Sequence, residues 1–128
     1  RHTCHLHFES HISAPVMADV RLLRQIATNL ISNAIKYSPQ GGEVRILAEP
    51  KPDGYWTLTV QDHGMGIPEA DLPGLFEAFY RAANVGDISG TGLGLAIVKQ
   101  AAEMHGGAVH LDSQVGIGTQ VTVVLPVG

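Results

Sequence analysis

The sequence predicts an α+β fold, a two-layer α/β sandwich in which a mixed five-stranded sheet is covered on one face by about three helices. Helix and strand patterns occur in mixed order along the chain, which favours a helical layer on a mixed sheet. The first helix pattern carries its apolar residues on one side, as expected of a helix that packs on such a sheet. With 128 residues, 45% of them hydrophobic, residues 1–128 are predicted to form a single domain.

The N-terminal elements follow from alternation and from end signals. Residues 3–10 alternate and place Leu6 and Phe8 on one face of a strand. A helix follows, capped by Asp19 and running to about Tyr37, where the sequence SPQGG ends it.

The rest of the chain repeats these patterns between turns that contain glycine or proline. PKPDG at residues 50–54 predicts a hairpin turn, and Gly106 predicts the C-cap of the last helix. The predicted elements are strands at 43–49 and 55–62, one or two short helices over Pro68–Tyr80 with Pro73 able to start the second, a loop at 81–89, a helix at 93–105, and strands at 107–113 and 119–126.

Charge and cysteine content exclude several classes of protein. The net charge is −4 with neutral histidines, so a nucleic-acid partner is not expected, because phosphate backbones bind basic surfaces. Cys4 is the single cysteine, which excludes an internal disulfide and is typical of a reducing compartment. The sequence has no apolar run long enough to span a membrane. Because it begins with Arg1, we expect a cytoplasmic fragment of a longer protein, which is either soluble or bound to a membrane.

The segment SGTGLGLAIVK, residues 89–99, places Gly90, Gly92 and Gly94 directly before a helix pattern. The free N–H groups and the dipole of a helix start attract anions such as phosphate. The segment lacks the Gly-Lys-Ser/Thr of a Walker loop, and it has GxGxG without a preceding strand where a dinucleotide fingerprint needs GxGxxG. Taken alone, it is equally compatible with a flexible turn before a helix.

Four residues of the first helix, Asn29, Asn33, Lys36 and Tyr37, share one face. Asparagine is a poor helix former, and an unsatisfied amide near a core costs ~1–3 kcal/mol. Amide oxygens are suitable ligands for Mg²⁺, which also binds substrate phosphates and water, and Lys36 would add a phosphate contact. The alternative is a solvated polar stripe.

Asp62 ends a strand in which Trp56, Leu58 and Val60 form the predicted buried face. Alternation therefore points the carboxylate toward the core, where it needs donors. Gly64 and Gly66 follow and leave open backbone beside it. A flat ring that bears an amino group would fill this space and donate to Asp62. The alternative is a capping aspartate in a tight turn.

Together and in this order, these features resemble the ATP-binding domain of sensor histidine kinases, within the wider group of gyrase, MutL and the heat-shock-90 chaperones. The resemblance covers residues from about 6 to 126, although His63 stands where the family usually has Asn or Thr. The matching segments are NLISNAIKY (29–37, N box), DHGMGI (62–67, G1 box), LFEAFYR (75–81, F box), GTGLGLAIVK (90–99, G2 box) and VGIGTQVTVVLP (115–126, closing strand pair).

The resemblance implies that ATP and Mg²⁺ are held between the helices and a lid formed by residues 81–89. Asn33 would ligate Mg²⁺ beside Asn29, Asp62 would accept from the adenine amino group with Thr119 acting through water, and Arg81 would meet the γ-phosphate. The implied nucleotide-binding residues are Asn29, Asn33, Lys36, Tyr37, Asp62, Gly64, Gly66, Ile67, Arg81, Gly90, Thr91, Gly92, Leu93, Gly94, Leu95 and Thr119.

The resemblance also implies a protein histidine kinase that donates the γ-phosphate to a histidine on a separate phosphoacceptor helical hairpin of the same protein, for transfer to a response regulator. The ATPase branches carry glutamate where Asn29 stands, and an amide cannot act as the base for water. The alternatives are a regulatory nucleotide-binding module and an ATPase of this group.

His11 does not fit the acceptor pattern of the family, because Ile12 replaces its acid and Pro15 comes one residue early. The acceptor histidine is therefore expected outside this chain. We expect the full-length protein to be a homodimer through missing helices, and this fragment to be monomeric.

Overall fold

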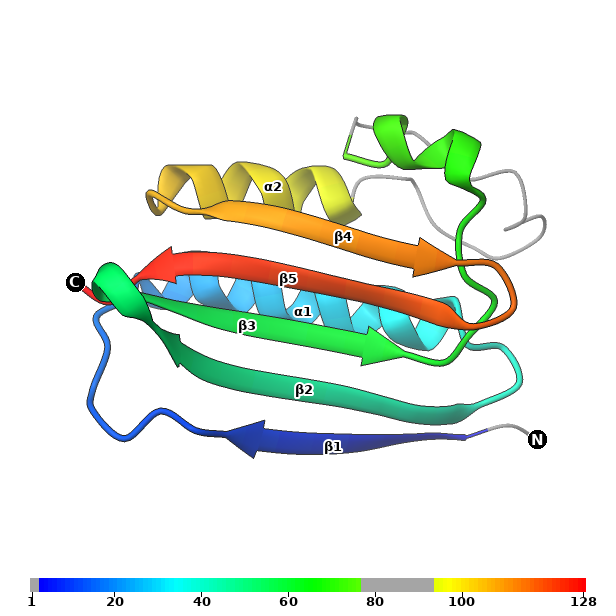
Figure 1. Cartoon of the computed structure of the whole chain (residues 1–128), viewed down its shortest axis with the longest axis horizontal. Helices are drawn as coiled ribbons and strands as arrows, with labels where there is room; N and C mark the ends of the chain where they lie inside the picture. The colour runs from blue at the N-terminus through cyan, green and yellow to red at the C-terminus, as the bar shows by residue number, and fades with distance from the viewer. Residues whose placement is uncertain (1–2, 77–93) are drawn as a thin grey trace.

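The computed structural model describes residues 3–76 and 94–128, in which both α-helices pack on one face of a sheet (Figure 1). The strand order is β1-β2-β3-β5-β4. β1 is parallel to β2 and the other neighbours are antiparallel, which confirms the predicted mixed five-stranded sheet. The elements are β1 (Cys4–Ser10), α1 (Val20–Lys36), β2 (Gly42–Lys51), β3 (Tyr55–Asp62), α2 (Gly94–Met104), β4 (Ala108–Gln114) and β5 (Gly118–Pro126).

The hydrophobic core lies between the helices and the three central strands. Alternate residues of each strand face the helices, as the sequence predicted for Trp56, Leu58 and Val60. Thr57, on the opposite face of the central strand β3, is also only 4% exposed. The fully buried large side chains are Ile26, Leu30, Val44, Val98, Val123 and Leu125.

The helix ends follow the predicted signals. Asp19 caps α1, because its Oδ1 accepts from the backbone N–H groups of Arg21 and Leu22 at 2.9 and 3.3 Å. α2 ends before Gly106, which adopts a φ of +83°, a conformation that glycine tolerates at a helix C-terminus. Gly107 N–H then donates to the Ala102 carbonyl at 2.8 Å.

The turn of the β2–β3 hairpin is shorter than predicted. β2 continues through Pro50 and Lys51, and a 3₁₀ turn over Pro52–Gly54 makes the connection. Proline is tolerated in a strand where no neighbour needs its N–H. The pairing of β1 with β2 ends at Ala48, so β2 is an edge strand at Pro50.

The helical layer has two α-helices within the described residues, where about three were expected. The segment predicted as one or two short helices from Pro68 is a 3₁₀ helix over Glu69–Gly74, with Pro73 inside it, and its continuation beyond residue 76 lies outside the described residues. No helix in the described part of the chain has the length and apolarity needed to cross a membrane.

Candidate nucleotide-binding site

A narrow cavity lies between α1, α2 and the sheet, at the end of β3. It brings together predicted site residues from four different elements and two connecting segments: Asn33, Tyr37, Asp62, Ile67, Leu95 and Thr119. Apolar side chains form the rest of the wall: Leu30, Ala34, Val60, Leu111 and Val121. The free space is about 10 Å³, roughly the room of one water molecule. A flat ring therefore enters only when the walls move apart.

Asp62 lies at this cavity as the last residue of β3 and is 4% exposed. Burial raises the pKa of its carboxyl, while the backbone N–H groups of Gly64 and Thr119 and the charge of His63 act in the opposite direction. Its Oδ1 accepts from the Gly64 N–H at 2.9 Å. The predicted direction of the Asp62 side chain, toward the core, is confirmed by its burial. No Lys or Arg side chain is among the groups that shift its pKa.

The two glycines after Asp62 allow the chain to pass between α1 and the β4–β5 turn. A Cβ on Gly64 would lie 2.0 Å from the Tyr37 carbonyl oxygen, and one on Gly66 would lie 2.1 Å from the Gln114 carbonyl oxygen. Gly66 also has a φ of +73°, which side-chain-bearing residues rarely adopt. Between them, Met65 N–H donates to the Tyr37 carbonyl at 2.9 Å. These contacts fix the segment that carries Asp62.

Two hydroxyl groups, those of Ser113 and Thr119, lie beside Asp62. Thr119 was predicted from the sequence, and Ser113 was missed. Ser113 Oγ donates to the Gly118 carbonyl at 3.0 Å, accepts from Ile67 N–H at 2.8 Å, and lies 2.7 Å from Thr119 Oγ1. Because the Ser113 hydroxyl donates its hydrogen bond to the Gly118 carbonyl, the Thr119 hydroxyl donates to Ser113 Oγ. The lone pairs of Thr119 Oγ1 then stay available to another donor.

The signal for Ser113 was present in the sequence, because it follows Val109 and Leu111 on the inward face of β4 just as Asp62 follows Val60 on β3. Gly118 was missed as well. A Cβ there would lie 2.1 Å from the Asp62 carbonyl oxygen, so Gly118 allows β5 to approach the end of β3. An open hollow of about 260 Å³ adjoins Asp62 and Thr119 on this side.

The two asparagines of α1 face the start of α2. A Cβ added to Gly94 would lie 3.3 Å from Asn33 Oδ1 and 3.5 Å from Asn29 Oδ1. The Asn29 Nδ2 donates to the Gln25 carbonyl at 2.7 Å, which leaves its oxygen directed toward α2. Two amide oxygens thus converge on a helix N-terminus, where N–H groups attract anions.

This donor set fits Mg²⁺ bound together with phosphates, because the cation prefers oxygen ligands and takes several from substrate and water. The described residues contain no group of three or more His, Cys, Asp or Glu side chains that could hold a metal by themselves. The protein share of such a site is therefore the asparagine oxygen.

The remaining predicted site residues either lie away from the cavity or fall outside the described residues. Lys36 does not line the cavity and borders a hollow on the outer side of α1, together with Ile35 and Ser32. Arg81, Gly90, Thr91, Gly92 and Leu93, and the lid predicted at 81–89, lie outside the described residues.

Residues 18–128 match the family of histidine kinase-, DNA gyrase B- and HSP90-like ATPases. The match spans the helix with the asparagines, the buried aspartate and the closing strands. The chain belongs to this family.

Several members of the family that resemble this chain are sensor histidine kinases. Histidine protein kinase DivJ of Caulobacter vibrioides is 43% identical over 113 residues, which cover 88% of this chain and 19% of DivJ. Sensor histidine kinase WalK of Bacillus subtilis is 41% identical over 114 residues, which cover 87% of this chain and 19% of WalK. The chain thus spans about a fifth of the length of these curated relatives.

Solved structures of the family have the same fold. The mycobacterial sensor histidine kinase MprB superposes with a TM-score of 0.82 at 36% identity, covering 94% of this chain and 83% of that one. Full-length ShkA in complex with AMPPNP superposes with a TM-score of 0.80 at 31% identity, covering 94% of this chain and 25% of that one.

Proposed function

We propose that this chain is the catalytic domain of a sensor histidine kinase, which binds Mg·ATP and donates the γ-phosphate to a histidine on a separate phosphoacceptor hairpin of the same protein. The observation that carries the proposal is the convergence of the Asn29 and Asn33 amide oxygens on Gly94, the first residue of α2. Asp62 lies buried in the cavity that Asn33 also lines. The asparagine oxygens suit the phosphates of a nucleotide, and Asp62 suits its base.

In this proposal, Asp62 recognises adenine by accepting from its exocyclic amine, and Thr119 accepts from a water beside the ring. Gly64, Gly66 and Ile67 shape the pocket, and Leu95 packs against the base from α2. Asn33 holds Mg²⁺ beside Asn29. When bound there, Mg²⁺ would supply neutralisation of the phosphate charge.

The transfer step needs no base for water. The lone pair of an unprotonated imidazole nitrogen forms the new N–P bond, the bond from the γ-phosphorus to the β-phosphate oxygen breaks, and ADP leaves. The proton on the other ring nitrogen is then released to solvent. Asn29 cannot take a proton from water, so hydrolysis is disfavoured, and the protein contributes positioning and charge neutralisation.

The wider setting belongs to the same proposal. The phosphohistidine passes its phosphate to an aspartate of a response regulator, in the cytoplasm, and the full-length protein forms a homodimer through helices outside this chain. The relatives support this setting because they are sensor kinases of much greater length. A regulatory nucleotide-binding module and an ATPase are the competing functions.

Calorimetry of the described domain with Mg·ATP tests the site directly. Asn33→Ala should weaken binding of Mg·ATP by about tenfold or more, which corresponds to about 1.4 kcal/mol, and should reduce the dependence of binding on Mg²⁺. Thr28→Ala is the matched control, since Thr28 lies on the exposed side of the same helix. Equal affinities for Asn33→Ala and wild type would remove Asn33 from the site.

Radiolabelled Mg·ATP then separates the competing functions. The isolated chain should neither label itself on histidine nor hydrolyse ATP appreciably. Joining its own phosphoacceptor hairpin should produce acid-labile phosphate on the hairpin, and labelling should be slower when the two pieces are mixed in trans. Rapid hydrolysis by the isolated chain would favour an ATPase, and nucleotide binding without transfer in the joined protein would favour a regulatory module.

A further inference from the structure

The helical layer leaves the inner face of β1 uncovered. Leu6 and Phe8 of this edge strand point to the same side of the sheet as the core, because they pair with Val44 and Ile46 of β2. Yet Leu6 is 42% exposed and Phe8 is 69% exposed. α1 packs over β2 and β3, and α2 packs over β4 and β5. The described helices therefore leave the position above β1 open (Figure 1).

The side of α1 that faces this opening is apolar. Ala27, Ile31 and Ile35 follow one another at every fourth residue, and Ile35 is 43% exposed. This stripe is separate from the face that carries the two asparagines. Exposed apolar residues scattered singly need no explanation, but a strand face and a helix stripe opposite each other do.

Two adjoining hollows join these surfaces into one groove, which we call the α1–β1 groove. The first, of about 400 Å³, lies between Phe8, Leu23 and Trp56. The second, of about 600 Å³, is lined by α1 alone and follows the helix past Ile35 to Lys36. The hollows share Ala27 and Ile31. Because a helix rises about 1.5 Å per residue, the groove from Leu23 to Ile35 is about 18 Å long.

The floor of the groove holds an unpaired hydrogen-bond donor. Trp56 lines the first hollow and is 5% exposed. Among the described residues, its indole Nε1–H has no hydrogen-bond partner. Indole N–H groups usually find a partner when buried. The buried wall of the groove therefore contains a polar atom that no described group satisfies.

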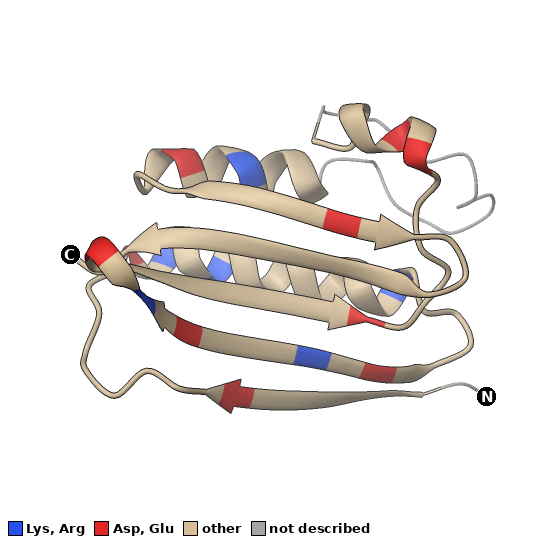
Figure 2. Cartoon of the chain, viewed as in Figure 1, with Lys and Arg blue, Asp and Glu red and all other residues tan. Residues whose placement is uncertain are grey.

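The charges on the helix side of the groove have one sign. α1 carries Arg21, Arg24 and Lys36 and no acidic residue, although the whole chain has a net charge of −4 (Figure 2). Arg24 lies on the same side of α1 as Ala27 and Ile31, one turn before them, and forms no ion pair with any residue that the structure describes. Lys36 borders the other end of the groove.

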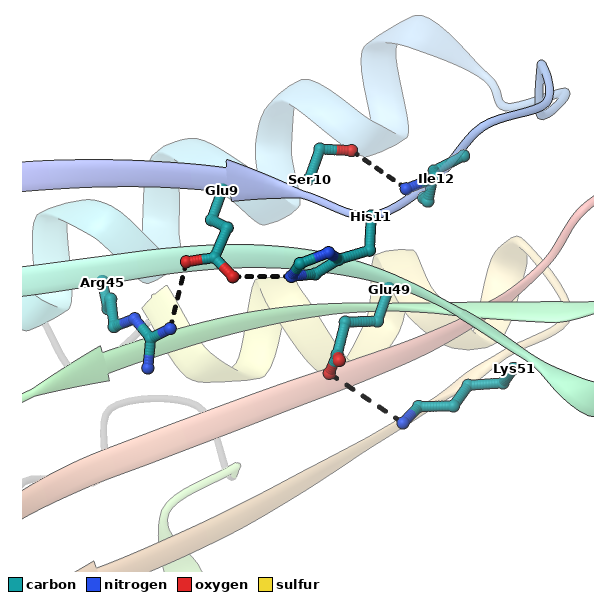
Figure 3. A network of polar contacts seen from close by, with 7 residues as sticks. All are labelled: Glu9, Ser10, His11, Ile12, Arg45, Glu49 and Lys51. Atoms are coloured by element: carbon teal, nitrogen blue, oxygen red, sulfur yellow. Dashed lines mark hydrogen bonds and ion pairs between the residues drawn. The ribbon is translucent and has the colours of Figure 1, made fainter.

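Glu9 is the one acidic residue that lines either hollow, and its carboxylate is already paired. His11 Nε2 lies 2.6 Å from Glu9 Oε2, and Arg45 Nη2 donates to Glu9 Oε1 at 3.1 Å (Figure 3). The groove therefore presents an apolar surface with unpaired positive charge along its helix side.

We propose that the α1–β1 groove binds an amphipathic α-helix whose apolar stripe is bordered by Glu or Asp. The length of the groove suits a helix that presents apolar side chains at i, i+3, i+4 and i+7, and acidic residues beside that stripe meet Arg24 and Lys36. Such a helix completes the helical layer over β1. This inference does not rest on the proposed kinase function, because the groove is on the opposite side of α1 from the asparagines.

The test uses two designed helical peptides, each about 18 residues or about 27 Å long, with the same leucine stripe and either Glu or Lys beside it. Each is titrated into isotopically labelled protein, and binding is followed by NMR. The Glu peptide should shift the resonances of β1 and of α1 around Phe8 and Ile31. It should bind at least about tenfold more tightly than the Lys peptide.

Two variants and a control assign the contacts. Phe8→Ser should weaken binding of the Glu peptide by about tenfold, whereas Met104→Ser, at a residue of the same exposure at the end of α2, should not. Arg24→Glu should reverse the preference in favour of the Lys peptide. Each variant is also measured for Mg·ATP affinity, which should stay at the wild-type value.

Several outcomes would overturn the proposal. They are no shift with either peptide at about 1 mM, equal binding of the two peptides, shifts confined to surfaces outside the groove, or a wild-type dimer in sedimentation that covers Phe8 with a second copy. Loss of peptide binding with Mg·ATP binding intact would leave the nucleotide site unaffected, so the two proposals fail separately.

Discussion

Two carboxylates near the ends of two strands of the same sheet have opposite environments. Asp62 ends the central strand β3 and is 4% exposed, and burial raises the pKa of its carboxyl. Glu9 lies near the end of the edge strand β1 with 43% of its side chain exposed. The hydrogen bonds from His11 and Arg45 lower the pKa of Glu9 (Figure 3).

The difference in environment distinguishes a candidate site carboxylate from a surface carboxylate. A desolvated acid with no Lys or Arg among the groups that shift its pKa costs more than an amide or an apolar residue in the same place, which makes Asp62 a candidate for a functional role. An exposed acid that pairs with Arg45 and is hydrogen-bonded to His11 needs no task, and such surface pairs contribute little to stability. The position in the sheet, central or edge, decides which environment a strand-end acid meets.

The largest expected effect is on nucleotide selectivity. Asp62→Asn should weaken ATP binding by about tenfold or more, because its amide adds a donor that opposes the adenine amine. Wild type should discriminate strongly against GTP, which has a carbonyl where adenine has its amine, and Asp62→Asn should lose part of that discrimination. Calorimetry with both nucleotides measures this, with Asp112→Asn on the exposed face of β4 as the control. Equal wild-type affinity for GTP and ATP would show that Asp62 does not read the base.

A smaller effect is expected on the pH dependence of stability. Because burial raises the pKa of Asp62 above its ordinary value of 3.8, the folded state binds this proton more tightly than the unfolded state does. The contribution of this group to the free energy of unfolding therefore decreases as pH rises from below 3.8 through the folded pKa. The side chain of Asp62→Asn does not titrate. Over that pH range, the free energy of unfolding of this variant, measured in urea, should therefore rise relative to that of wild type. Parallel stability curves for the two proteins would show that the carboxyl is not desolvated.

The smallest effect is expected at Glu9. Its pKa is lowered, so any stability that it contributes is present at neutral pH and is lost as pH falls through the folded pKa. Because the pair is exposed, Glu9→Gln should shift the urea midpoint slightly at low salt and not measurably at high salt. Glu49→Gln is the matched control, since Glu49 pairs with Lys51 alone at 3.9 Å. A salt-independent loss at Glu9 would contradict its description as a surface group.

Local signals predicted much of the fold and part of the site. Alternation placed Asp62 on the buried face of its strand, helical periodicity grouped Asn29 and Asn33, and Asp19 and Gly106 marked helix ends. Each of these depends on neighbours within a few residues. The helical period also grouped Lys36 with the asparagines, whereas the structure places it at the outer side of α1. Residue spacing defines a helix face that is wider than the strip of α1 that lines the cavity.

Features that depend on distant partners were not predicted. Pro50 lies inside β2 because β1 stops pairing there, which no local pattern reveals. Gly118 is required by the approach of the Asp62 backbone from another strand. The open face beside Phe8 follows from which strands the two helices cover. These are consequences of packing between segments far apart in the sequence.

Trp56 gives the molecule an optical reporter of its own. It is the single tryptophan in the sequence, and its indole lines the α1–β1 groove rather than the nucleotide cavity. Its fluorescence therefore originates from one defined place, so emission changes report on the groove without an attached dye. A ligand that contacts the groove and one that enters the nucleotide cavity are distinguishable by how strongly each quenches or shifts this signal in the unmodified protein.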